Sequence, residues 1–158
     1  MITACRECGA SLADGQACID RFHALLLMEY EVAADPTESS EGRGAVTHFY
    51  AVSSYVLQHP NGMNYTAEAL TELRRDLADH LAGRVTLPEL RHRVSRAAVG
   101  PGRVTCRAGD EVVWWSVQSW PVTVADIIKG GVIGYGKRVA AWAESVVGTL
   151  EAATGRSK

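Results

Sequence analysis

The chain has 158 residues, of which 47% are hydrophobic and 22% are charged, and its formal net charge at pH 7 is -2. This length allows a sizeable core, and we expect one domain over residues 1–158. The small net charge offers no basic surface for nucleic acid, and no apolar run approaches the roughly 18 residues that cross a bilayer. The first residues do not form a charged and then apolar leader. We therefore expect a cytoplasmic protein without a nucleic-acid or membrane partner.

Three of the four cysteines lie in the first eighteen residues. Cys5 and Cys8 enclose two residues and precede Gly9, a spacing that forms a tight turn and points both thiolates the same way. Sequential ligands of tetrahedral zinc need this geometry. Without a leader, the spacing favours metal or redox chemistry over disulfides. The sequence therefore predicts an N-terminal zinc knuckle.

Apolar residues at helical spacing predict a first helix over about residues 16–34 and a second over about 45–58. Pro60 ends the second helix, because the residue before proline is pushed out of helical torsions. The polar residues between the two helices predict a loop. A loop of modest length favours an antiparallel hairpin of the two helices.

The rest of the chain continues the helical pattern. It predicts a third helix over about 66–82, a fourth over about 86–99, a small β-hairpin within 103–120, a short helix from about 123 and a final helix after about 136. The predicted fold is mainly α. It is an antiparallel helical bundle with an N-terminal zinc knuckle and at most one small β-hairpin.

Register selects one of the five histidines as the fourth zinc ligand. His48 and His59 share a helix face but stand about 16 Å apart at 1.5 Å per residue, so they cannot bind one ion together. In an antiparallel hairpin the first helix starts beside the end of the second, which puts Cys18 level with His59. We predict a closed, structural Cys3His zinc site. Its ligands are Cys5, Cys8, Cys18 and His59.

Other arrangements of these thiols stay open. Cys18 could be a core residue, with Cys5 and Cys8 as a redox pair and His59 capping its helix. Cys18 or His59 could instead stay unbound, so that the metal keeps an open position for water and acts as a Lewis acid. Cys106, a distant thiol in the predicted hairpin, could replace a ligand.

The same register places Glu29 level with His48. A glutamate on an apolar stripe is costly to bury unless it is paired, hydrogen-bonded or protonated, and His48 is the expected partner. The two form a candidate catalytic pair, as base and orienting group, or the ligands of a second metal. The alternative is a hydrogen bond that only joins the helices. Phenols that could join the pair are those of Tyr30, Tyr50, Tyr55 and Tyr135.

Several motifs together resemble a bacterial family of small proteins of unknown function. They are Cys-x2-Cys-Gly at 5–9, Cys18, Glu29-Tyr30, His48 and Tyr-Val-Leu-Gln-His-Pro at 55–60. The similarity covers roughly the first sixty residues well and extends weakly to Thr-Val-Ala-Asp at 123–126 and to the helix with Trp142 and Ala143. It implies that the four predicted zinc ligands, Glu29 and His48 are family positions, and it implies no established reaction.

Three classes of function follow from these patterns. The first is a zinc-binding helical domain with a partly apolar small-molecule pocket near Glu29, His48 and the tryptophan-rich segment around Trp115 and Trp120. The second is a small metal-assisted or acid-base enzyme acting on a metabolite, which would show the Glu29–His48 pair facing a cavity. The third is a protein-binding adaptor or sensor, which would seal that pair and expose an apolar face elsewhere.

Overall fold

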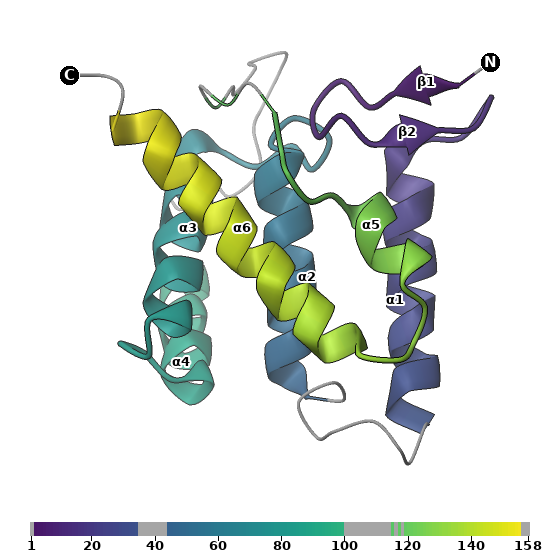
Figure 1. The fold of residues 1–158 in the computed structure, drawn as a ribbon. Helices are drawn as coiled ribbons and strands as arrows, with labels where there is room; N and C mark the ends of the chain where they lie inside the picture. The colour runs from purple at the N-terminus through teal and green to yellow at the C-terminus, as the bar shows by residue number, and fades with distance from the viewer. Residues whose placement is uncertain (1, 35–43, 100–114, 116, 118, 156–158) are drawn as a thin grey trace.

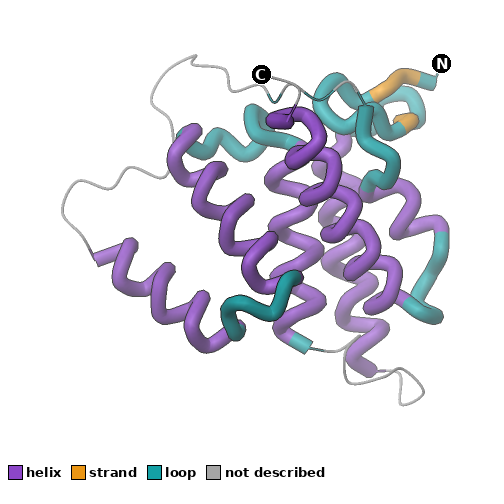
Figure 2. Tube along the Cα trace, turned by 60° about the vertical axis from the view of Figure 1, so that its left-hand side comes forward, coloured by secondary structure: helices purple, strands orange, loops and turns teal. Residues whose placement is uncertain are grey.

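The computed structural model describes residues 2–34, 44–99, 115, 117 and 119–155. The described part consists mainly of helices, with two short strands near the N-terminus (Figure 2). Its elements are β1 (Thr3–Ala4), β2 (Ser11–Leu12), α1 (Cys18–Ala34), α2 (Ala45–Gln58), α3 (Ala67–Leu81), α4 (Leu87–Val99), α5 (Val124–Lys129) and α6 (Tyr135–Gly155). The predicted mainly α fold is confirmed.

Helices α1 and α2 run in opposite directions beside each other, as the hairpin prediction requires (Figure 1). Aromatic side chains fill the space between them. The rings of Phe22 and Tyr55 stack with centroids 4.0 Å apart and planes at 9°. Both side chains are buried, so each withdraws a large apolar surface from water and joins the two helices.

Helix α6 crosses α2 diagonally and supplies much of the core (Figure 1). Its inward face repeats at helical spacing through Val139, Trp142 and Val146, all fully buried. The indole of Trp142 donates to the side-chain oxygen of Gln58 at 3.2 Å, and the amide of Gln58 donates to the carbonyl of Val122 at 2.7 Å. A buried glutamine is tolerated here because both ends of its amide are paired.

Helices α3 and α4 begin with caps that the sequence signals. The hydroxyl of Thr66 accepts a hydrogen bond from the backbone N–H of Ala69 at 3.2 Å. At the start of α4, the backbone N–H of Thr86 donates to Glu89 at 2.7 Å, which is one half of a capping box. The guanidinium of Arg93 reaches Asp76 at 3.3 Å and so ties α4 to α3.

The described strands lie in the N-terminal knuckle, outside the segment 103–120 in which a hairpin was predicted. β1 and β2 pair antiparallel within the N-terminal knuckle, with Thr3 opposite Leu12 and Ala4 opposite Ser11. Two-residue strands are too short to show an alternating pattern, so no periodicity predicts them. The hairpin predicted within 103–120 falls mostly outside the described residues, and the described residues of that segment are not in strands.

Within the described part of the chain, no helix combines the length and the apolar character that crossing a bilayer requires.

Candidate metal centre

Four side chains from three segments converge at the top of the α1–α2 hairpin. The cysteine–histidine cluster consists of Cys5, Cys8, Cys18 and His59, whose candidate ligand atoms all lie within 4.8 Å of one another. The Sγ of Cys5 is 3.6 Å from Nε2 of His59, and the Sγ atoms of Cys8 and Cys18 are 3.6 Å apart. Ligands about 2.3 Å from a tetrahedral ion stand about 3.8 Å from each other. The cluster therefore has the composition and size of a site that could hold a metal ion.

Backbone hydrogen bonds fold residues 5–10, the knuckle, around the first two thiols. The N–H of Cys5 donates to the carbonyl of Ala10 at 2.8 Å, and the N–H of Gly9 donates back to the carbonyl of Cys5 at 2.9 Å. Gly9 has a φ of +79°, a conformation that a side chain disfavours. The N–H of Ala10 also points at Sγ of Cys8, at 3.5 Å. Such a contact stabilises a thiolate, the form that binds metal.

The imidazole of His59 is held in one orientation and one tautomer. Its Nδ1 lies 2.8 Å from the backbone carbonyl of Tyr55. A carbonyl oxygen can only accept, so Nδ1 carries the hydrogen and Nε2 is the nitrogen that faces the thiols. The ring also stacks on Tyr55, with centroids 3.9 Å apart. His59 is 2% exposed, so the helix end presents a buried and oriented ligand.

Glu7 fastens the knuckle to the turn that follows His59. Its carboxylate accepts hydrogen bonds from the backbone N–H groups of Asn61 and Gly62, at 2.8 and 3.1 Å. A Cβ at position 62 would lie 3.0 Å from the carboxylate, so a glycine allows this close approach. The indole of Trp120 donates to the carbonyl of Glu7 at 3.1 Å. Sequence reasoning missed Glu7, whose position between two cysteines was its only signal.

The cluster shifts the protonation of its own members. Burial works against a charged His59, but hydrogen bonds with Cys18 and Cys5 outweigh burial and raise the pKa of the imidazole to about 9. Hydrogen bonds from Cys18 and Cys8 lower the pKa of Cys5, whereas bonds with Cys18 and Cys5 raise the pKa of Cys8. The three thiols and the imidazole therefore influence one another's protonation. A cation bound between them would displace the protons that they carry.

The Glu29–His48 pair lies at the other end of the hairpin. Nδ1 of His48 is 2.7 Å from one oxygen of Glu29, and the hydroxyl of Tyr135 donates to the other oxygen at 3.0 Å. The side chains of His48 and Glu29 are 59% and 17% exposed, so the histidine is more open to solvent than its stripe suggested. Burial, followed by the Glu29 charge, raises the pKa of Tyr135. Among the four candidate phenols, Tyr135 is the one that meets Glu29.

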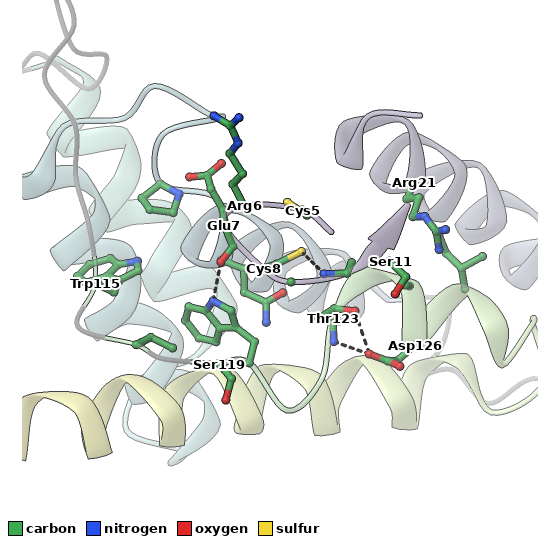
Figure 3. Close-up of a pocket in the computed structure, with 18 of the residues that line it drawn as sticks. Cys5, Arg6, Glu7, Cys8, Ser11, Arg21, Trp115, Ser119, Thr123 and Asp126 are labelled. Atoms are coloured by element: carbon green, nitrogen blue, oxygen red, sulfur yellow. Dashed lines mark hydrogen bonds between the residues drawn. The ribbon is translucent and has the colours of Figure 1, made fainter. Parts of the chain in front are cut away.

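A cavity of about 780 Å³ adjoins the cluster and not the Glu29–His48 pair. The knuckle forms one wall, α5 forms another, and a third is formed by Trp115, Val117, Ser119 and Trp120 (Figure 3). The expectation of a cavity beside the tryptophan-rich segment agrees with this geometry. Neither Glu29 nor His48 lines this cavity, so a pocket beside that pair stays a prediction.

The fold and the cluster define a class: a mainly helical protein with a Cys3His group near its N-terminus that could hold a metal ion. The chain belongs to a Family of unknown function (DUF5946), whose family model matches residues 3–151. The match covers both the first sixty residues and the later segments to which the resemblance extended weakly. No curated protein and no solved structure matches the chain.

Proposed function

We propose that this is a cytoplasmic zinc protein in which the cysteine–histidine cluster holds one structural zinc ion and supports a small-molecule cavity. The observation that carries the proposal is the convergence of four candidate ligand atoms, three thiols and one imidazole nitrogen, within 4.8 Å of one another. A helical hairpin alone would not require a knuckle folded over its end. A bound metal ion would explain why the knuckle folds over the end of the hairpin.

The donor set favours zinc. Three thiolates and one imidazole suit a borderline-soft ion with tetrahedral preference, and Cys3His is a common structural zinc set. Four protein ligands fill a tetrahedral shell and leave no position for a substrate water. Three of the four members, Cys8, Cys18 and His59, are buried, which further favours a structural over a catalytic ion.

Metal analysis tests the proposal directly. Protein purified without chelator should contain about one zinc per chain, and Cys5→Ser or Cys18→Ser should reduce that content strongly. Cys106→Ser is the matched thiol control and should leave the zinc content unchanged. Protein that carries no metal under these conditions, or that forms a Cys5–Cys8 disulfide in a reducing cytoplasm, contradicts the proposal.

A second candidate function is acid-base chemistry at Glu29 and His48. The specific observation is the chain of bonds from Tyr135 through Glu29 to His48, which fixes Nδ1 of the histidine and leaves the other ring nitrogen unused by the pair. An orienting carboxylate and a solvent-accessible imidazole are the parts of a general base. Against it, neither residue lines the cavity of about 780 Å³ or the smaller cavity of about 370 Å³.

Glu29→Gln separates a catalytic pair from a structural bridge. If the pair is catalytic, the variant loses turnover of any converted metabolite while it keeps the fold and the zinc content, since the amide preserves shape and removes charge. His23→Gln changes an exposed histidine of the same helix and is the control. A variant that melts differently but turns over metabolite normally assigns the pair to structure alone.

A further inference from the structure

The cavity beside the knuckle has two carboxylates in its wall, and the protein already engages both. Glu7 accepts the backbone N–H groups of Asn61 and Gly62. Asp126 accepts both the backbone N–H and the hydroxyl of Thr123, at 2.8 and 2.9 Å. A cationic ligand would have to compete with these donors at both oxygens of Glu7 and at Oδ2 of Asp126.

The tryptophans of the cavity can offer a ligand apolar ring surface but no hydrogen-bond donor. The indole N–H of Trp115 donates to the carbonyl of Leu57 at 2.7 Å, and that of Trp120 donates to the carbonyl of Glu7 at 3.1 Å. With both donors satisfied inside the protein, the aromatic rings are left for apolar or stacking contact. Val117 continues the apolar lining of this wall.

The cations of the cavity, in contrast, are available. Among the described residues, neither Arg6 nor Lys129 has a hydrogen-bond or ion-pair partner. Arg21 donates to Gln16 through Nε at 3.3 Å, and its two terminal nitrogens have no hydrogen-bond partner among the described residues. A guanidinium with both terminal nitrogens open can bind a carboxylate through two parallel hydrogen bonds.

Arg21 and Trp115 lie at opposite ends of the cavity, and Arg6 lies between them (Figure 3). In Figure 3, Ser11 lies next to Arg21. Lys129 is the last residue of α5, which packs against α1, the helix of Arg21. The basic end therefore lies between α1 and α5, and the aromatic end lies along the segment that precedes α5.

We infer that this cavity binds a planar, largely apolar small molecule that carries one carboxylate. The carboxylate pairs with Arg21 at the basic end, and the planar body lies against Trp115 and Trp120. A volume of about 780 Å³ falls in the range of about 300–1,000 Å³ that ligand sites occupy. The inference deepens the proposed function and rests on it, because the knuckle that forms one wall is the part that the metal holds.

Two probes of the same size and opposite charge test the ligand class. 2-Naphthoate and 2-naphthylmethylammonium share the planar body and differ in the charged group. Calorimetric titration of the zinc-loaded full chain should give one binding site for naphthoate, at least about tenfold tighter than for the cation, as a charge-assisted bidentate pair supports. Equal affinity for the two probes, or binding of neither, overturns the inference.

Substitutions test which end of the cavity binds the carboxylate and which end binds the planar body. Arg21→Gln should weaken naphthoate binding by about tenfold or more and remove the preference over the cation. Lys129→Gln, at an exposed position, should also weaken naphthoate binding. It replaces Arg21→Gln as the test variant if Arg21→Gln folds poorly. Trp115→Leu should weaken both probes alike. Arg75→Gln, on α3 and outside the cavity, is the matched control. Naphthoate affinity that falls no further in Arg21→Gln and Lys129→Gln than in this control overturns the inference.

Zinc content measured on each sample keeps this inference apart from the proposed function. Zinc-loaded protein that fails to bind naphthoate refutes the ligand class and leaves the metal site standing. Folded protein without zinc that still binds naphthoate through Arg21 refutes the structural metal and supports the ligand class. Folded protein that lacks zinc and binds neither probe refutes both.

Discussion

The two ends of the α1–α2 hairpin each join the same helices through a histidine, yet they differ in nearly every physical respect. Eleven positions separate Cys18 from Glu29 on α1, and eleven separate His48 from His59 on α2. At the upper end, His59 is 2% exposed and meets three thiols. At the lower end, the side chain of His48 is 59% exposed and meets one carboxylate.

The difference shows that surroundings, and not residue type, decide what a histidine contributes. His59 is fixed by a backbone carbonyl and a stacked ring, so little entropy is lost when it binds a metal. His48 is fixed by a side chain alone, and exposed pairs of this kind contribute about 0–1 kcal/mol. Structural zinc in small domains contributes on the order of 10 kcal/mol. The upper end should therefore dominate stability.

Replacing a thiol at the upper end should have the largest effect. Cys8→Ser exchanges a thiolate for a hydroxyl, a poor zinc ligand, and should lower the free energy of unfolding by several kcal/mol together with the zinc content. Urea denaturation followed by circular dichroism measures the loss. Ser11→Ala, at an exposed position of β2, is the control. A Cys8→Ser protein as stable as the parent shows that the upper end is not a structural metal site.

The contact between Glu7 and the turn after His59 should matter less but measurably. In Glu7→Gln, one amide oxygen can still accept an N–H, but the amide nitrogen faces the other N–H and cannot accept it. We expect about tenfold weaker zinc binding with an unchanged fold, as for other residues that support metal ligands. Competition with a chromophoric chelator gives the value. Glu31→Gln, at an exposed position of α1, is the control, and equal zinc affinity of the two variants would remove the supporting role of Glu7.

Zinc affinity should rise with pH. The pKa of His59 is raised to about 9, so the imidazole carries a proton at neutral pH that must leave before Nε2 can bind a metal. Below that pKa, each unit of increasing pH should raise the apparent affinity up to about tenfold per proton displaced, and acidification should release the ion. Chelator competition from about pH 6 to about pH 8.5 tests the sign. A constant affinity over that range contradicts proton displacement.

The smallest effect is expected at the lower end. Glu29→Gln keeps an acceptor for Tyr135 but removes the charge that faces His48, so we expect a loss of about 1 kcal/mol or less. Thermal unfolding with His23→Gln as reference measures it. A loss of stability comparable to that of Cys8→Ser would mean that the two ends stabilise the hairpin equally.

The sequence predicted most where a single period or spacing dominates. The second helix was expected over 45–58 and is found at Ala45–Gln58, because its apolar stripe is continuous and Pro60 forbids further helix. The metal cluster followed from two such rules, the Cys-x2-Cys spacing and the register of an antiparallel hairpin. Both rules act over short distances or along regular helices.

What could not be predicted depends on contacts between distant segments. The carboxylate of Glu7 meets backbone groups 54 and 55 positions away, and no local pattern announces such a contact. The cavity beside the knuckle is built from the knuckle, α5 and Trp115 and Trp120, and no local pattern shows that these segments meet. The hydroxyl of Tyr135 finds Glu29 across 106 positions, and four phenols were equally eligible from sequence.

The indole bond from Trp120 to the Glu7 carbonyl has a consequence for the order of assembly during synthesis. Cys5 lies 54 positions before His59, whereas Glu7 lies 113 positions before Trp120. At roughly 5–20 residues per second, the ribosome delivers the last metal ligand about 3–10 s after the first thiols and takes as long again to deliver the tryptophan wall. If the cluster binds a metal ion, all four of its ligands are therefore available before the cavity wall that contains Trp115 and Trp120 has been synthesised.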